Sequence, residues 1–247
     1  SVRMCLSSVE ATDPASPRYQ DSSLKKAIDA TLDHWLENRY QNPNWWHNEI
    51  GVPRLMQDII VLLRKNLTAL QFEQAMAVLA QHHVRGTGAN LVWSADLGLH
   101  YGALSRDVVM IRKCSDLISN EIRVTTKEGI QPDYSYHQHG PRLQTYHYGS
   151  SFLRENIKLA WELRGTPWAF AGEKTDILLD FVLKGWQWMA RGSYTVPGTI
   201  DRAVSRKGNL SNADLRAMIP YLLELKPQHA EVLDALKERQ DGAGKPL

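Results

Sequence analysis

The sequence of 247 residues contains only two cysteines, Cys5 and Cys114. Two cysteines form neither the disulfide framework of a small secreted scaffold nor a four-thiolate metal site, and they leave the redox compartment and their own oxidation state open. No apolar run reaches the roughly 18 residues that a membrane-spanning helix needs. Even the richest stretch, residues 177–189, is interrupted by Asp180 and Lys184. The sequence therefore predicts no membrane-spanning segment.

An excess of one charge is also missing. Twenty-nine lysines and arginines face 27 aspartates and glutamates, which leaves a formal net charge of +2. This balance excludes binding to nucleic acid or to a membrane by bulk charge, so an anionic ligand has to be met by a local basic cluster. The start of the sequence has no signal-peptide pattern, and we expect that any export signal has been removed or was never present.

The pattern that dominates the sequence is helical. Leu24, Ile28, Leu32 and Leu36 recur every four residues behind Ser22 and Ser23, two possible caps, which predicts a helix up to about residue 38. Strand signals are nearly absent. We predict an all-α protein whose helical hairpins form a ring or partial ring. Eight further blocks follow the helical pattern: 53–65, 68–84, 89–105, 107–122, 149–164, 173–191, 211–225 and 228–239.

The helices are predicted to form one continuous domain over residues 23–247. Residues 1–22 contain Pro14, Pro17 and several serines and predict an irregular entry segment. Long loops in a helical protein commonly carry function. Three stretches escape the helical pattern: 41–51, 126–148 and 192–209.

The first of these loops contains the neighbouring tryptophans Trp45 and Trp46. Neighbours on a helix point about 100° apart, so at least one indole is expected to be exposed. An exposed indole can stack on the apolar face of a sugar ring, while nearby amides bind hydroxyl groups. The alternative is that both tryptophans wedge the loop against the helices.

The second loop is the richest in chemistry. Residues 129–149 hold three of the nine histidines and four of the nine tyrosines. Histidine and tyrosine can exchange a proton while they carry no charge in their resting forms. Taken individually, His137 and Tyr134 are better explained as structural hydrogen-bonding residues.

The third loop carries Arg202 and Arg206, which would share one face if the segment were helical. Two guanidinium groups suit a carboxylate or sulfate ligand, or they lower the pKa of a nearby tyrosine. The alternative is a pair of surface salt bridges. The glycine-rich turn at residues 85–93 could cradle a phosphate, but it lacks the Lys-Ser/Thr pair of a P-loop.

Together these segments resemble one family. The motifs are Asn-Trp-Trp at 44–46, Thr-Gly-Ala-Asn at 87–90, Tyr-His-Gln-His-Gly-Pro at 136–141 followed by Tyr-Gly at 148–149, and Arg-Ala-Val-Ser-Arg at 202–206. In this order they resemble the α-helical domain of polysaccharide lyase family 8, which includes chondroitin AC, hyaluronate and xanthan lyases. Residues 128–144 are closest to the chondroitin AC branch, and the resemblance covers roughly residues 24–240.

The resemblance implies a fold and a set of site residues. Family enzymes have an incomplete α/α toroid followed by a large β-sandwich region. This sequence stops at Leu247 without a strand-rich segment, so we expect a piece of a longer enzyme that lacks the β-sandwich region and a glutamate from it. The implied catalytic residues are Asn90, His139, Tyr148, Arg202 and Arg206; the implied substrate-binding residues are Trp45 and Trp46, with Asn44, Gln138 and Arg142.

The implied reaction is β-elimination on a uronic acid. Asn90, helped by His139, would neutralise the carboxylate, because donors placed where charge develops are each worth roughly 3–4 kcal/mol. Tyr148 would take the C5 proton and then protonate the leaving oxygen. A tyrosine ordinarily ionises near pH 10, and Arg202 would supply the charge that such a base needs. Arg206 would bind a substrate carboxylate. His139 is an alternative base, and neither a metal nor a cofactor is required.

Three other functions stay open. A glycoside hydrolase on the same fold would need two carboxylates, for which Asp96, Asp133 and Glu49 are available. His137, His139 and His147 could form a metal site, and the chain could also be a non-catalytic glycan-binding module. For the lyase we expect an anionic polysaccharide substrate, the missing β region as partner, and secretion or a periplasmic location. The particular polymer, internal or terminal attack, activity of this chain alone and oligomeric state stay open.

Overall fold

The computed structural model describes residues 2–242. The described chain groups into two compact units: one holds the residues up to Val84 together with Asp96–Ile111, and the other holds Arg85–Ala95 and the residues from Arg112 onward. The long helix α5 (Gly88–Ser105) contributes to both units. Among the described residues, no helix is long and apolar enough to cross a bilayer.

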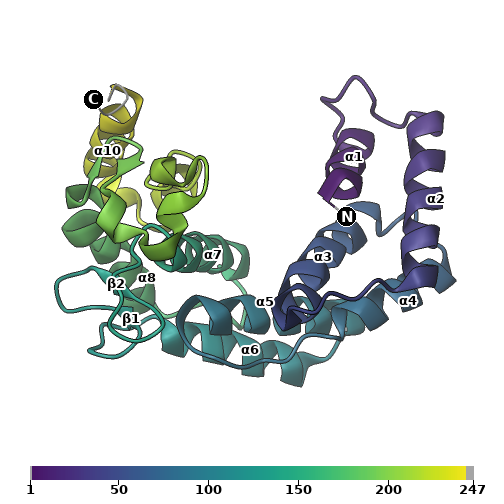
Figure 1. Ribbon diagram of the computed structural model, residues 1–247, viewed down its shortest axis with the longest axis horizontal. Coiled ribbons are helices and arrows are strands. Elements are labelled where there is room, and N and C mark those ends of the chain that lie inside the picture. The colour runs from purple at the N-terminus through teal and green to yellow at the C-terminus, as the bar shows by residue number, and fades with distance from the viewer. Residues whose placement is uncertain (1, 243–247) are drawn as a thin grey trace. The chain divides into compact units, whose positions relative to one another are not determined.

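The first unit is built around four helices: α1 (Val2–Thr12), α2 (Ser22–Asn38), α3 (Val52–Leu63) and α4 (Ala69–Leu79). Helix α1 packs against α2 and α3, as Figure 1 shows for the purple end of the chain. The core of this unit is formed by aliphatic side chains that repeat along one face of each helix, among them Leu32, Ile59 and Val78. A short π-helix, His47–Gly51, precedes α3.

Helix α1 differs from the irregular entry segment that the sequence predicts for residues 1–22. Ser8 is buried, and its hydroxyl donates to the Met4 carbonyl at 2.8 Å, so the serine is satisfied within the helix. Residues 13–21 are irregular, as predicted. The cap of α2 also differs, since the Asp21 carboxylate, rather than Ser22 or Ser23, accepts from the amides of the first turn.

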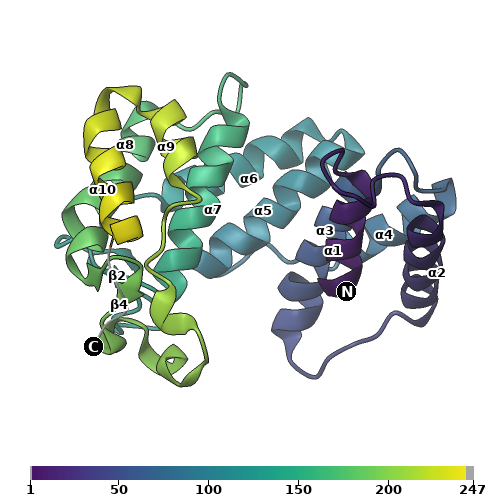
Figure 2. The same ribbon diagram turned by 90° about the horizontal axis from the view of Figure 1, so that it is seen from above.

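The second unit contains most of α6 (Val108–Glu121) and four later helices: α7 (Tyr148–Leu163), α8 (Gly172–Asp180), α9 (Ile219–Leu225) and α10 (Ala230–Gly242). Helix α7 contacts α8 and α9, and α9 contacts α10 (Figure 2). Large aromatic side chains fill the space between α7, the turns after α8 and the long loops; these are Tyr136, Tyr146, Phe152, Phe181 and Trp186, all fully buried.

Two small antiparallel hairpins occur in the second unit. Strand β1 (Gly129–Ile130) pairs with β2 (Tyr136–His137), and β3 (Ala190–Arg191) pairs with β4 (Tyr194–Thr195). Both hairpins are too short to change the fold class, so the prediction of an all-α protein is confirmed. The catalytic domain predicted for residues 23–247 draws on both units, and its extent stays a prediction; residues 243–247 lie outside the described residues.

Candidate active site

Only one tyrosine of the second loop fits the role of a base. Tyr136 and Tyr146 are fully buried, and this burial raises the pKa of both phenols. The Tyr146 hydroxyl donates to the Trp186 carbonyl. The Tyr134 hydroxyl donates to the Asp180 carboxylate at 3.2 Å. These three phenols are therefore held in structural hydrogen bonds, and Tyr148 is left as the candidate.

Tyr148 is the first residue of α7 and lies at the centre of a side-chain cluster. Its hydroxyl oxygen accepts a hydrogen bond from Nη2 of Arg202 at 3.0 Å. The ring of His139 meets the Tyr148 ring edge-on at a centroid distance of 4.8 Å, and the Trp93 ring lies at 6.0 Å. The structure therefore joins three of the predicted catalytic residues, Tyr148, His139 and Arg202, in the second unit.

Asn90 lies in the first turn of α5, three residues before Trp93. Residues three apart share a helix face, and Trp93 contacts Tyr148, so Asn90 is on the side of α5 that faces Tyr148. The start of the helix is held by the loop opposite: the Ala89 amide donates to Oε1 of Gln138 at 3.2 Å and to the Tyr136 hydroxyl at 3.1 Å. The helix geometry thus places Asn90 on the face of α5 that carries Trp93, and its catalytic role stays a prediction.

Arg202 and Arg206 lie at and just after the 3-10 helix Asp201–Ser205. The α-helical face predicted for this pair is not formed, because a 3-10 helix has three residues per turn and does not stack residues four apart. The positive charges of Arg202 and Arg206 still act on one side chain, that of His147. The pKa of His147 is lowered to about 4, first by burial and then by the charges of Arg206 and Arg202, so His147 is neutral near pH 7.

Two predicted substrate-binding residues of the second unit have different roles. Gln138 is 1% exposed, and its side chain bonds the Ala89 amide, the Thr87 carbonyl and the Glu128 carboxylate. The buried Gln138 side chain therefore supports the backbone of the site, which corrects the prediction that it contacts substrate. Arg142 is exposed and pairs with Asp201 at 3.7 Å, so its guanidinium is accessible at the rim of the third loop.

Sequence reasoning missed the residue that shapes the second loop, Gln144. This side chain is fully buried. Its Nε2 donates to the Gln138 carbonyl at 2.9 Å, and its Oε1 lies 3.0 Å from Nδ1 of His147. Its backbone carbonyl accepts from the His147 and Gly149 amides. No sequence signal could have revealed it, because its burial and its partners are set by the fold.

The first loop lies in the first unit. Trp45 is 47% exposed, which confirms that at least one indole is accessible. Trp46 is half-buried, and its ring lies over Gly51, where an added Cβ would come within 2.8 Å of the indole. Asn44 is exposed, and its side chain accepts from the Trp46 amide at 3.1 Å. Substrate binding by Trp45, Trp46 and Asn44 stays a prediction.

Two of the acids available to a glycoside hydrolase, Asp96 and Asp133, are engaged in other contacts. Asp96 is 4% exposed and pairs with Arg54 at 3.5 Å and with His100 at 2.9 Å. The Asp133 carboxylate accepts from the Ser135 amide at 2.9 Å, and hydrogen bonds from Ser135 lower its pKa. A carboxyl with a lowered pKa is unsuited to the role of general acid, so Asp133 does not supply that member of a carboxylate pair.

The proposed histidine metal site is not assembled. Within residues 2–242, no group of three or more His, Cys, Asp or Glu side chains has the geometry to hold a metal ion. His139 and His147 instead each pack edge-on against one phenol, Tyr148, with ring centroids at 4.8 and 4.7 Å. Their arrangement matches support of a tyrosine better than ligation.

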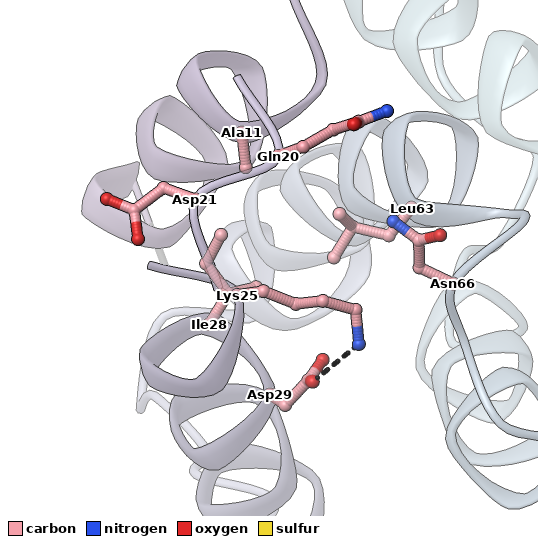
Figure 3. Close-up of a pocket in the computed structure, with 8 residues that line it drawn as sticks. All are labelled: Ala11, Gln20, Asp21, Lys25, Ile28, Asp29, Leu63 and Asn66. Atoms are coloured by element: carbon pink, nitrogen blue, oxygen red, sulfur yellow. Dashed lines mark hydrogen bonds and ion pairs between the residues drawn. The ribbon is translucent and has the colours of Figure 1, made fainter. Parts of the chain in front are cut away.

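A separate pocket of about 230 Å³ lies in the first unit (Figure 3). Asp21, Lys25 and Asp29 line it, and Nζ of Lys25 is paired with the Asp29 carboxylate at 3.0 Å. Two carboxylates against one paired ammonium make this pocket unsuited to an anionic ligand. The cluster around Tyr148 is therefore the better candidate for the site.

Comparison with protein families gives an independent result. Residues 8–238 match the model described as polysaccharide lyase family 8, N terminal alpha-helical domain. The chain is 31% identical over 219 residues to chondroitinase-AC of Pedobacter heparinus, and 27% identical over 198 residues to xanthan lyase of a Bacillus species. These alignments cover 84% and 76% of this chain but only 31% and 20% of the two relatives.

Solved structures agree with the sequence match. A chondroitinase AC lyase that was studied with oligosaccharide complexes superposes with a TM-score of 0.90 and 26% identity, over 98% of this chain and 36% of that one. The chondroitin AC lyase of Streptomyces coelicolor A3, in complex with chondroitin sulphate, gives a TM-score of 0.82 at 22% identity, over 100% of this chain and 41% of that one. The predicted α/α toroid is consistent with these folds.

Proposed function

Since the chain belongs to polysaccharide lyase family 8 through its N-terminal α-helical domain, we propose that it is the catalytic helical part of a lyase that cleaves uronic-acid-containing glycans by β-elimination. The reaction removes the proton on C5 of the uronic acid and breaks the 4-O-glycosidic bond. The products are an unsaturated uronide and a new reducing end, and the leaving oxygen takes up one proton.

The first requirement of this reaction is control of charge. Proton removal next to an ionised carboxylate places a second negative charge on the same group, so donors have to meet that carboxylate first. The Asn90 amide, on the face of α5 toward Tyr148, and the exposed ring of His139 are suited to this task. Hydrogen-bond donors fixed where charge develops are each worth roughly 3–4 kcal/mol.

The second requirement is a base that can return its proton. Arg202 donates to the Tyr148 oxygen, so a positive charge lies beside the atom that has to exchange the proton. The Tyr148 oxygen, once deprotonated, takes the C5 proton, and the resulting phenol gives a proton to the leaving oxygen. Arg206 adds positive charge for a substrate carboxylate. The 3.0 Å bond from Arg202 to Tyr148 is the single observation that carries this proposal.

The rest of the enzyme belongs to the proposal as well. The chain spans less than a third of the length of the curated relatives it matches, so we expect a β-sandwich region of the same enzyme to complete the substrate site. We also expect export to the periplasm or the medium, because a polymeric substrate does not enter a cell.

The direct test follows the ultraviolet absorbance of the conjugated double bond that only elimination creates. The enzyme, including the expected β-sandwich region, is incubated with chondroitin sulfate, hyaluronan and xanthan. Tyr148→Phe is compared with Tyr221→Phe, which changes a tyrosine of α9 outside the cluster. We expect Tyr148→Phe to lose at least about 1,000-fold in turnover with an unchanged circular dichroism spectrum, and Tyr221→Phe to keep its rate. Near-normal turnover of Tyr148→Phe would overturn the assigned base. Saccharide binding without product in every variant would favour a non-catalytic module.

A further inference from the structure

The Glu128 carboxylate joins two segments that are far apart in sequence. Its Oε2 accepts from the Thr87 hydroxyl at 2.6 Å and from Nε2 of Gln138 at 2.6 Å, and its Oε1 accepts from the Gly140 amide at 2.8 Å. Thr87 immediately precedes α5, and Gln138 and Gly140 flank His139. One side chain therefore bonds both the segment that leads to Asn90 and the turn that carries His139.

The turn around His139 needs such a hold. His139 has a φ of 61°, and Gly140 follows with a φ of 78°. A residue with a side chain rarely adopts the left-handed region, and it persists there only when its surroundings fix it. The bond from the Gly140 amide to Glu128 fixes the peptide that follows His139. Without it, this turn can relax toward ordinary backbone angles and carry the imidazole away from Tyr148.

The same carboxylate controls Asn90 through a relay. Glu128 orients the Gln138 amide, and Oε1 of Gln138 accepts from the Ala89 amide at 3.2 Å. Ala89 is fully buried and is the neighbour of Asn90. In the same turn, the Gly88 amide donates to the buried Glu121 at 2.6 Å. Glu121 holds α5 from α6, whereas Glu128 and Gln138 together couple α5 to the His139 turn.

We propose that Glu128 is a positioning residue that sets the spacing between Asn90 and His139 by tying the start of α5 to the turn at His139. The inference rests on the proposed elimination, in which these two groups meet the substrate carboxylate. Burial acts to raise the pKa of Glu128, but the hydrogen bonds from Thr87 and Gly140 outweigh it, so that the pKa lies below its ordinary value. Glu128 is therefore ionised near pH 7 and accepts all three bonds.

The variants are chosen so that the protein still folds. Glu128 lines a surface cavity of about 250 Å³ together with Lys127, His137 and Pro141, so water can enter the space that Glu128→Ala leaves. Glu128→Gln keeps the shape and one acceptor oxygen, and Thr87→Val removes one bond. Glu162→Gln, which breaks a surface ion pair with Lys158 on α7, is the matched carboxylate control. Ile157→Val lowers stability in the core of α7 without touching the site.

Amide hydrogen exchange tests the tie without any substrate. In Glu128→Ala we expect the Gly140 amide, which loses its acceptor, to exchange at least about tenfold faster. The Ala89 amide should also exchange faster, by a smaller factor, because its acceptor Gln138 loses the partner that orients it. Glu128→Gln should show a smaller effect, and the amides in the middle of α7 should not change. Unchanged exchange at both amides would overturn the proposal whatever the turnover.

Steady-state kinetics test what the tie does. Glu128→Ala should lose about 30- to 100-fold in kcat with KM within about threefold, since the donors it places act mainly in the transition state. Glu128→Gln should recover part of this loss, and Glu162→Gln and Ile157→Val should keep the normal kcat. Faster exchange with a normal kcat would overturn the positioning role. Absence of product from the unmodified protein on every polymer would instead contradict the proposed elimination. The hydrogen-exchange result would still decide whether Glu128 holds the two segments together.

Discussion

At the scale of single residues, His147 links the site to stability. Its pKa in the folded protein is about 4, below the ordinary 6.5, because it is buried near Arg206 and Arg202. Below about pH 6.5 the imidazole of the unfolded chain binds a proton more readily than that of the folded protein. The free energy of unfolding is therefore highest above about pH 6.5 and falls as the pH is lowered toward 4. We expect the urea midpoint to fall between about pH 7 and pH 4.5, and to fall less in His147→Gln. An equal slope in both proteins would contradict this assignment.

The resemblance to the lyase family implies His139, Tyr148 and Arg202 as site residues, and the structure brings these three side chains together. The supporting residues could not be predicted, because their partners are set by the fold. Glu128 bonds Thr87 across 41 positions, and no periodicity relates two such residues. Gln138 is predicted to bind substrate, but the structure buries it. A glutamine beside a histidine gives no sign of whether its amide points outward or into a buried network.

At the scale of elements, the periodicity predicted nine of the helices and missed the places where packing or proline overrides it. In place of the one helix predicted for 173–191, α8 ends at Asp180 and a π-helix follows up to Gly185. The Tyr134 backbone lies against this glycine. The helix predicted from 211 begins only at Ile219. Pro220 follows at the start of α9, where proline is favoured, and Asp214 holds a separate turn before it.

The first turn of α5 makes a tight contact with the second loop. Gly88 has a φ of 56°, and an added Cβ would overlap Oε1 of Gln138 and the Tyr136 hydroxyl. We expect Gly88→Ala to lower the free energy of unfolding by about 2–4 kcal/mol through backbone strain and overpacking. Gly165→Ala is the control, because that glycine also has a positive φ but has open space around it. Urea titration of both variants measures the difference, and equal losses would show that only backbone strain matters.

The two neighbouring tryptophans of the first loop are expected to respond differently. Trp45→Ala removes an indole that is 47% exposed, so saccharide affinity should fall by about tenfold while stability changes by less than about 1 kcal/mol. Trp46→Ala removes the ring that covers Gly51 and should cost about 2 kcal/mol of stability. Oligosaccharide titration and thermal unfolding separate the two effects. A large stability loss in Trp45→Ala with normal affinity would assign Trp45 to the loop structure.

At the scale of the whole molecule, the division into two compact units is the feature that the sequence hides. The boundary falls inside α5, between Ala95 and Asp96, where the helix continues without a break. A helix can run unbroken while its two halves pack into different cores. Periodicity reports the helix, and only the three-dimensional contacts report which core each half joins.

The low net charge gives the last prediction. With +2 over 247 residues, attraction of an anionic polymer has to come from local groups such as Arg202 and Arg206, whose charges converge on His147. Salt shortens the screening length from about 30 Å at 0.01 M to about 8 Å at 0.15 M, so affinity for chondroitin sulfate should fall as salt rises. Arg206→Gln should weaken binding by about tenfold at low salt and flatten this dependence. Lys158→Gln removes an equal charge from the surface pair on α7 and should leave both the affinity and its salt dependence unchanged. An equal effect of the two variants would mean that bulk charge, rather than the arginine pair, attracts the polymer.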